Sequence, residues 1–442
     1  MYHEIENLYM EDDRPWVIGY SGGKDSTAVV QLIFTALERL AARQELHKPI
    51  YVISSDTLVE TPLIIDYINN TLRLIEESAM QKGLPITTHK VKPLTDQTFW
   101  VNMIGRGYPA PRQKFRWCTD RMKIDPANRF ILEKVSEFGE VIMVLGVRSA
   151  ESSSRAQTMN KHSVQGRLLS RHSTLSNAYV YAPIRDFTTD DVWTYLLQVP
   201  SPWGSDNNEL LAMYQNSNSE CPLVIDKSTP SCGNSRFGCW TCTVVTEDKA
   251  LSGFIQNGQD WLEPLLIYRD WLVEIRDDSN RREKKRMNGT VYYTAPDQIG
   301  LGPFTLEARK EILSELLQTQ KQVRTPEGQT YELISLEELY KIQEIWLAAG
   351  DWELSVLDIY NNIFNVELQW SGSEREILSH DQLKLLEELC NQYEVPYEIV
   401  QRLLFLEWKN LGYSYRHGMT KEMISILREQ WLHIGSYEEV LE

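Results

Sequence analysis

Long apolar runs are missing from this 442-residue sequence. No stretch approaches the roughly 20 consecutive apolar residues that a membrane-spanning helix requires. The first residues, MYHEIENLYMEDDRPW, are acidic and lack the apolar core of a secretory signal. We therefore expect a protein that is neither secreted nor inserted in a membrane and that works in the cytoplasm.

Positive charge is also in short supply. The chain carries 62 Asp and Glu against 45 Lys and Arg, a formal net charge of −17. Residues 331–442 hold 21 acids and 8 bases, whereas the first 330 residues hold 41 and 37. The net negative charge argues against a stand-alone DNA-binding protein. The first 330 residues are nearly neutral and could still carry local basic patches. The basic stretches lie at 106–116, 161–171 and 281–286, and each is either a nucleic-acid contact or a solvated loop.

Cysteine is scarce as well, with six residues in the whole chain. A reducing cytosol argues against structural disulfides. Four of the six crowd into residues 221–242, which indicates a metal site. An iron–sulfur cluster prefers thiolate ligands, and a zinc ion is the alternative. The four are Cys221, Cys232, Cys239 and Cys242, and the other two are Cys118 and Cys390.

Hydrophobic periodicity predicts an α/β fold followed by a helical region. The length suits two or three domains of roughly 100–200 residues each. Short apolar runs alternate with helical patterns at 25–43 and 60–82, which favours a doubly wound, mostly parallel sheet. The expected strands are 16–20, 51–54, 86–91, 141–145 and 179–184. Helical patterns return at 261–275, 305–322, 335–348, 381–394, 397–410 and 420–433.

The strongest local signal is the hexapeptide SGGKDS at Ser21–Ser26, set between the first strand and the first of these helices. Its two glycines let backbone N–H groups turn around an anion, and the helix N-terminus adds further donors. Lys24 adds a cation, while Asp25 could hold Mg²⁺ or cap the helix. The alternative is an ordinary glycine-rich turn. The Walker A spacing is absent, which argues against an ordinary P-loop NTPase.

This hexapeptide resembles the phosphate loop of the PP-loop ATP pyrophosphatases, which cleave ATP between its α- and β-phosphates. Three further elements, in family order over about residues 14–245, resemble the phosphoadenosine phosphosulfate (PAPS) reductase-like branch. Each element alone could be a turn, a cap or a solvated loop. The elements are Asp56-Thr57…Glu60-Thr61, Gly146-Val147-Arg148…Glu151-Ser152…Arg155 and Pro183-Ile184…Asp186…Asp191-Val192-Trp193, with Phe187 where the family has Trp.

The resemblance implies an adenine nucleotide α-hydrolase-like fold and a nucleotide site at the phosphate loop. We expect a PP-loop domain over 1–199, a cysteine-rich iron–sulfur segment over 200–247 and a helical region over 248–442 that is acidic beyond about 330. ATP and Mg²⁺ are the expected ligands. The implied nucleotide-binding residues are Ser21, Gly22, Gly23, Lys24, Asp25, Ser26, Asp56, Gly146, Arg148 and Arg155.

Cluster-bearing sulfonucleotide reductases take ligands from an early C-x-x-R/K segment and a later C-x-x-C, and Cys118 and the Cys239/Cys242 pair fall at similar places. This sequence has a single cysteine at 118 where that group has a tandem pair, so Cys232 is expected as the fourth ligand of a [4Fe–4S] cluster. Cys221 is then a ligand, a persulfide carrier or a buried thiol, and Cys390 a buried thiol.

The string Cys232–Val245 and the long acidic tail resemble the DndC family, sulfurtransferase-type subunits that replace a non-bridging oxygen of the DNA backbone with sulfur. This implies double-stranded DNA as the substrate, and a cysteine desulfurase with DndD- and DndE-type subunits as partners. The implied catalytic residues are Lys24, Asp25, Arg148 and Cys221. The alternatives are a sulfonucleotide reductase, a tRNA-thiolating enzyme and a nucleotide-binding scaffold. The chain lacks the reductases' C-terminal cysteine motif and a recognisable RNA-binding module.

Overall fold

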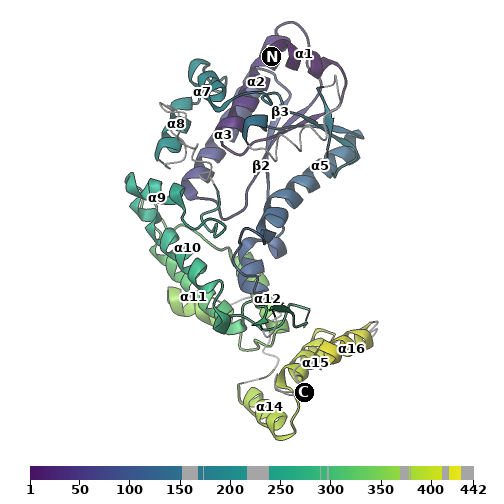
Figure 1. The fold of residues 1–442 in the computed structure, drawn as a ribbon, viewed down its shortest axis with the longest axis vertical. Helices are drawn as coiled ribbons and strands as arrows, with labels where there is room; N and C mark the ends of the chain where they lie inside the picture. The colour runs from purple at the N-terminus through teal and green to yellow at the C-terminus, as the bar shows by residue number, and fades with distance from the viewer. Residues whose placement is uncertain are drawn as a thin grey trace. The chain divides into compact units, whose positions relative to one another are not determined.

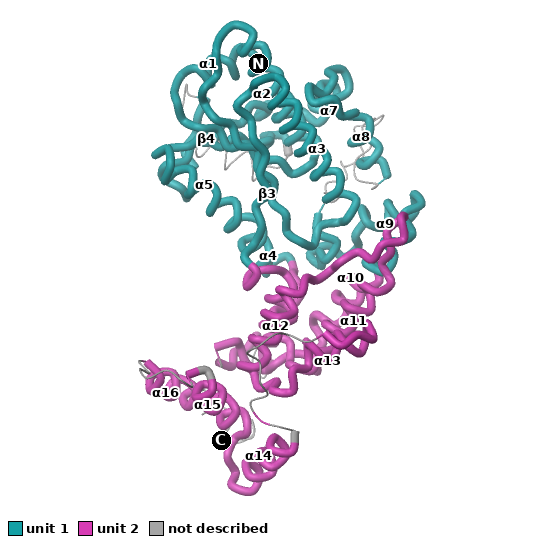
Figure 2. Tube along the Cα trace, turned by 180° about the vertical axis from the view of Figure 1, so that it is seen from behind, with its two compact units in different colours: residues 1–94, 113–266 teal, residues 95–112, 267–442 magenta. Residues whose placement is uncertain are grey.

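The computed structural model describes residues 1–151, 168–172, 174–216, 238–288, 290–295, 298–368, 378, 380–410 and 418–429. The chain forms two compact units, each of which takes two segments of sequence (Figure 2). Unit 1 comprises residues 1–94 and 113–266, and unit 2 comprises residues 95–112 and 267–442. In the described parts of the chain, no helix is both long and apolar enough to cross a membrane.

Unit 1 is built on a six-stranded sheet with the strand order β3-β2-β1-β4-β6-β5. Only the short edge strand β5 runs antiparallel to its neighbour. The predicted mostly parallel sheet is therefore confirmed, and each of the five predicted strands is present. The strands are β1 (Trp16–Gly19), β2 (Ile50–Ser55), β3 (Ile86–Val91), β4 (Val141–Val144), β5 (Ser170–Arg171) and β6 (Ala178–Tyr181).

Helices flank this sheet. Helices α2 (Lys24–Ala41) and α3 (Pro62–Gln81) lie on one side of it and α5 (Asp125–Phe138) on the other (Figure 1). Alternate strand residues explain why both faces are covered, since successive side chains of a strand point to opposite faces. Val17 packs with Ile131 of α5, whereas its neighbour Trp16 packs edge-on against Tyr9.

Four α-helical segments of unit 1 were not among the predicted elements, and the last two, at 189–198 and 207–216, are described below. The first is α1 (Tyr2–Met10), which supplies Tyr9. The second begins with the single turn α4 (Trp117–Thr119) and passes through a π-helical turn, Asp120–Ile124, into α5. A π-helical turn changes which side chains share a helix face and occurs often at functional sites.

The polypeptide after the sheet adds three more helices to unit 1. Helix α7 (Thr189–Gln198) begins with a capping box in which Thr188 and Asp191 satisfy each other's backbone N–H groups. Asp191 of the third family element thus has a structural role in the fold. The other two helices are α8 (Asn207–Asn216) and α9 (Lys249–Gln256).

Unit 2 is helical, as predicted, apart from a small two-stranded hairpin. Its helices agree with the predicted patterns, and α13 is an addition. They are α10 (Glu263–Ile275), in which the unit boundary falls, α11 (Leu306–Gln322), α12 (Leu336–Ala348), α13 (Ser355–Phe364), α14 (His380–Gln392), α15 (Tyr397–Lys409) and α16 (Met419–Glu429). The hairpin pairs β7 (Tyr293–Ala295) with β8 (Gln298–Ile299).

The segment 95–112 lies within the first predicted domain by sequence, yet it packs into unit 2. The Trp346 indole N–H donates to the Ile104 carbonyl oxygen at 2.9 Å, and the Trp100 indole N–H donates to the Leu333 carbonyl oxygen at 2.7 Å. Both tryptophans are fully buried, so these bonds satisfy groups that water cannot reach. The predicted functional divisions at 199 and 247 remain predictions.

Candidate functional site

The phosphate loop follows β1 directly and closes on itself. Gly22 adopts a φ of +73°, a backbone conformation that favours glycine. The Ser21 backbone N–H donates to Ser26 Oγ at 3.2 Å, and the Ser26 hydroxyl donates to the Gly23 carbonyl oxygen at 2.9 Å. Because the N-cap residue of α2 is Gly23, it offers no side chain to cap the first amides of that helix. The loop therefore presents backbone donors of the kind that bind phosphate.

The loop lies where the sheet reverses its winding direction. Strand β1 has β2 on one side and β4 on the other, so the loops after β1 and β4 meet at a topological switch point. Gly146, just after β4, packs directly on the start of α2. A Cβ atom at Gly146 would lie 2.9 Å from both the carbonyl carbon and the carbonyl oxygen of Asp25. The contact requires glycine, which explains the residue that begins the second family element.

An ion pair joins these two loops. Arg148 Nε donates to Asp25 Oδ1 at 2.7 Å, and Arg148 Nη1 lies 3.3 Å from the Thr189 hydroxyl oxygen. Lys24 Nζ lies 3.7 Å from Asp25 Oδ2. Both cations are buried, at 3% exposure for Arg148 and 5% for Lys24. The Asp25 carboxylate thus lies between two cations in the structure and does not cap α2.

Asp56 follows β2 directly and begins a tight turn. Its carboxylate accepts the Leu58 backbone N–H at 3.0 Å and lies near the ammonium groups of Lys90 and Lys92, at 3.7 and 3.6 Å. Leu58 has a φ of +64°, which is unusual for a residue with a side chain. The structure therefore gives Asp56 a role in holding this turn. Two lysines also place positive charge beside it.

The C-x-x-C segment docks on this same turn. The Trp240 backbone N–H donates to the Val59 carbonyl oxygen at 3.1 Å, and Glu60 and Cys239 pair as an isolated antiparallel bridge. The Thr57 hydroxyl lies 3.3 Å from Cys239 Sγ, within hydrogen-bonding distance. The family element at Asp56–Thr61 therefore carries the first cysteine of the predicted pair, which the sequence alone did not indicate.

Lys123 and Glu60 form the charged surroundings of the thiols. Lys123 Nζ lies 3.9 Å from Glu60 Oε1, and the nearby Cys239 raises the pKa of the Lys123 ammonium. Burial raises the pKa of the Glu60 carboxyl to about 7 and that of the Cys239 thiol to about 11. Burial and the neighbouring Cys242 raise the pKa of Cys118. Three predicted ligands thus gather around one lysine, which stands on the π-helical turn after Cys118.

The donor chemistry of this cluster fits a thiolate-bound metal centre. A metal deprotonates the thiols it binds, so burial does not prevent coordination. Among the described residues, however, no three His, Cys, Asp or Glu side chains are placed to hold a metal ion. The expected fourth ligand, Cys232, lies outside the described residues, as do Cys221 and Arg155. Cys390 is buried in unit 2, as predicted.

Tyr214 is a site residue that sequence reasoning missed. It lies on α8, outside every family element, and its hydroxyl oxygen accepts the Lys24 backbone N–H at 3.2 Å. A single tyrosine in a polar stretch carries no sequence signal, because its contact to Lys24 spans 190 residues. Trp193 of the third family element packs edge-on against the Tyr214 ring, whereas Asp186 is exposed.

Two arginines of the basic stretch 281–286 form ion pairs and hydrogen bonds within unit 2. Arg281 pairs with Asp278 and Glu311, at 2.6 and 2.8 Å. Arg282 is 4% exposed and donates to the Gly302 carbonyl oxygen at 2.7 Å. Of the other two stretches, Arg112 pairs with Asp277 at 3.3 Å, and most of 161–171 lies outside the described residues.

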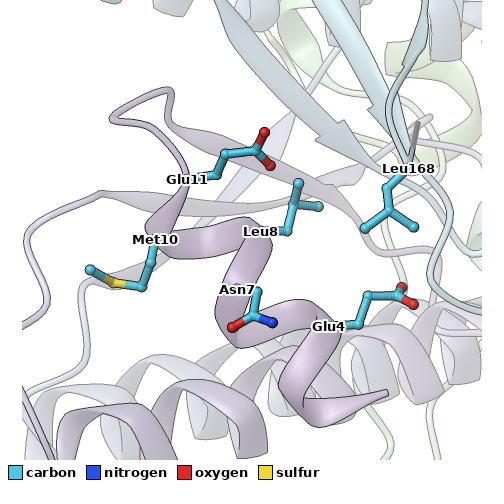
Figure 3. Close-up of a pocket in the computed structure, with 6 residues that line it drawn as sticks. All are labelled: Glu4, Asn7, Leu8, Met10, Glu11 and Leu168. Carbon is cyan, nitrogen blue, oxygen red and sulfur yellow. The ribbon is translucent and has the colours of Figure 1, made fainter. Parts of the chain in front are cut away.

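A surface hollow of about 420 Å³ lies elsewhere on unit 1 (Figure 3). Its walls come from α1, from Glu11 just after that helix and from Leu168, and they include the carboxylates of Glu4 and Glu11. Two carboxylates disfavour the binding of a phosphate group. No predicted site residue lines it, and we assign it no part in nucleotide binding. The residues that line it are Glu4, Asn7, Leu8, Met10, Glu11 and Leu168.

Comparison with known proteins agrees with this geometry. Residues 15–245 match the phosphoadenosine phosphosulfate reductase domain family, which is more than half of the chain. The chain belongs to this family. The matched range contains the phosphate loop, the three further elements and the cysteine cluster. It ends just beyond Cys242, so the helices of unit 2 lie outside the family domain, apart from segment 95–112.

Three individual proteins illustrate the spread of the similarity. An uncharacterized protein of Methanocaldococcus jannaschii is 28% identical over 199 residues, 45% of this chain and 35% of that protein. The match thus spans about a third of the length of that relative. The second is the PAPS reductase of Candida auris, solved with phosphate. The match covers 48% of this chain and 84% of the reductase chain, at 15% identity and with a TM-score of 0.30. The third is the U34-tRNA thiolase NcsA of Methanococcus maripaludis, solved with its [4Fe–4S] cluster. The match covers 62% of this chain and 79% of the thiolase chain, at 12% identity and with a TM-score of 0.29.

The contact at Gly146 gives a direct test of the site. We expect Gly146→Ala to destabilise the protein by about 1–3 kcal/mol, because the added methyl group meets rigid backbone and not a movable side chain. Urea unfolding measures this loss. Gly19→Ala is the matched control, since its Cβ would meet only the end of the Leu145 side chain, at 3.2 Å. Equal stability of the two variants would show that the close approach is not a constraint.

Proposed function

We propose that this protein activates a phosphate oxygen with ATP and then exchanges that oxygen for sulfur. The observation that carries the proposal is the phosphate loop at the sheet's switch point, with the buried cations Lys24 and Arg148 held on Asp25. Membership of the PAPS reductase domain family supports a nucleotide as ligand. The docking of Cys239 on the Asp56–Thr61 turn supports sulfur chemistry near that nucleotide.

The first step would be adenylation. The β- and γ-phosphates of ATP bind backbone amides of the phosphate loop, with Mg²⁺ and Lys24 neutralising their charge. The acceptor oxygen attacks the α-phosphate, and pyrophosphate leaves. Catalysis of this step rests on positioning and charge, since the reaction needs no covalent bond to the protein. Arg148 fixes Asp25 and so acts as a positioning residue for the loop.

The second step would deliver sulfur. A sulfide-level nucleophile attacks the activated phosphorus, and AMP leaves as the better leaving group. Cys118, Cys232, Cys239 and Cys242 would hold a [4Fe–4S] cluster, which could bind or brace the incoming sulfur. Lys123 and Glu60 stand beside the described thiols and set the charge there. Cys221 is the rival carrier: its persulfide would attack the activated phosphorus, and a thiol would then reduce the resulting S–S bond and release the thiophosphate.

The finer proposal is that the acceptor is a backbone phosphate of double-stranded DNA. The sequence around the C-x-x-C and the acidic helical tail support it through their resemblance to the DndC family. A cysteine desulfurase and DndD- and DndE-type subunits would be the partners. Arg281 and Arg282 bind to groups of the protein itself, so the basic stretch 281–286 offers less positive surface to DNA than its sequence suggested. A more basic partner would then supply much of the electrostatic attraction to DNA.

A pyrophosphate-release assay tests the first step. We expect Lys24→Ala to lower ATP-dependent pyrophosphate release at least about a hundredfold, because one buried cation that stabilises the leaving group is lost. Lys82→Ala is the control, since Lys82 lies at the end of α3 and pairs with Glu38. Unchanged release in Lys24→Ala would reject the phosphate loop as the ATP site.

Metal analysis tests the thiol cluster. We expect anaerobically purified protein to contain iron and acid-labile sulfide, and each of Cys118→Ser, Cys239→Ser and Cys242→Ser to lose most of both, because serine is a poor ligand for iron–sulfur clusters. Cys390→Ser should keep the wild-type content, since Cys390 lies on α14 of unit 2. Zinc in place of iron would reject the cluster but keep the thiol site.

The DNA acceptor is tested in cells. We expect mass spectrometry to find phosphorothioate linkages in DNA from cells with the wild-type protein and its partners. Lys24→Ala and Cys239→Ser should abolish them, because each removes one of the two steps. Lys82→Ala and Cys390→Ser should leave them in place. Linkages that persist in both loss variants would rule out this assignment, and normal pyrophosphate release without any linkage would point to a sulfonucleotide or a tRNA.

A further inference from the structure

Tyr214 contacts the phosphate loop at two points. The residue is 7% exposed and lies on α8. Its hydroxyl oxygen accepts the Lys24 backbone N–H at 3.2 Å, and Lys24 Nζ lies 5.2 Å from the centre of its ring. An ammonium group at this distance is attracted by the negative face of an aromatic ring. One side chain therefore holds both the main chain and the ammonium of the residue that begins α2.

The other end of α8 is fixed to the same helix. Asn207 Nδ2 donates to Gln31 Oε1 at 3.1 Å and to the Leu196 carbonyl oxygen at 2.8 Å. Gln31 follows Lys24 by seven residues, and Asn207 precedes Tyr214 by seven residues. Seven residues make about two helical turns. Helices α2 and α8 therefore run antiparallel, and contacts join them at Lys24–Tyr214 and at Gln31–Asn207. The two contacts together fix the position of Tyr214 along the axis of α2.

The ring of Tyr214 is also held sideways. The Trp193 ring packs edge-on against it, with centres 5.2 Å apart and planes at 89°. On the loop side, a Cβ at Gly23 would lie 3.2 Å from the Tyr214 hydroxyl oxygen, so the hydroxyl rests close to the loop backbone. These contacts hold the ring between Trp193 and the phosphate loop, where it lies against Lys24. Figures 1 and 2 both show α7 and α8 on the α2–α3 side of the sheet.

We propose that Tyr214 is a positioning residue for Lys24, which it holds, together with Asp25, ready for the outer phosphates of the nucleotide. The inference rests on the proposed function and adds a residue from outside the family elements to its site. A lysine side chain has many rotamers, and ordering it costs free energy when a ligand binds. Tyr214 orders Lys24 before ATP arrives, so the nucleotide meets a cation that is already in place.

A double-mutant cycle tests this role, with ATP affinity measured by calorimetry. We expect Tyr214→Leu to weaken ATP binding about 3–10-fold, because the lysine loses its aromatic support. Tyr214→Phe keeps the ring and should lose only about twofold. In a Lys24→Ala background, Tyr214→Leu should cost no more than that twofold, because the ammonium on which the ring acts is absent.

Tyr195→Leu is the matched control for loss of a packed tyrosine in unit 1. Tyr195 lies on α7 and bonds to the Tyr2 hydroxyl, so ATP affinity should stay at the wild-type value. An equal loss from Tyr214→Leu with and without Lys24 would overturn the inference, since Tyr214 would then act only through the fold. Wild-type protein that fails to bind ATP would overturn the proposed function as well, whereas normal binding with an additive cycle would overturn this inference alone.

Discussion

The site depends on one close approach, that of Gly146 to the first turn of α2. A methyl group at this position would come within 2.9 Å of the Asp25 backbone. The absence of a side chain lets β4 bring its following loop against the phosphate loop, and only then can Arg148 reach Asp25. Close-packed backbone cannot move aside as a side chain can, so this contact fixes the two loops of the switch point relative to each other.

Much of the fold could be predicted because its signals are local. Buried parallel strands give short apolar runs, and amphipathic helices give a 3.6-residue period, so β1 to β4 and the helices α2 and α3 follow from the sequence. The turn from α4 through Asp120–Ile124 into α5 did not, because a π-helical turn shifts the period that reveals a helix. Nor did the packing of 95–112 into unit 2, which is fixed by bonds such as Trp346 to Ile104 across 242 residues.

The candidate site likewise has parts with a local sequence signal and parts that depend on long-range contacts. The phosphate loop is contiguous, and its residue types indicate the binding of an anion, so Ser21–Ser26 could be proposed as a nucleotide site from the sequence. The partners of those residues could not be, since they are set by tertiary contacts. Asp25 pairs with Arg148 across 123 residues, and Lys24 meets Tyr214 across 190. The sequence shows which charged side chains the candidate site has. The packing of the fold determines which of these side chains already pair with one another before a ligand would bind.

The turn Asp56–Thr61 joins the sheet edge of the proposed nucleotide site to the thiol cluster. Asp56 directly follows β2, the strand beside β1, and Glu60 pairs with Cys239. Six residues span at most about 20 Å when fully extended, and this turn is tighter than that. The backbone that leaves the carboxyl end of β2 therefore reaches the C-x-x-C segment within a few residues. A left-handed Leu58 in the middle stiffens the turn, so a sulfur donor held by these thiols would be placed relative to the phosphate loop by the sheet itself.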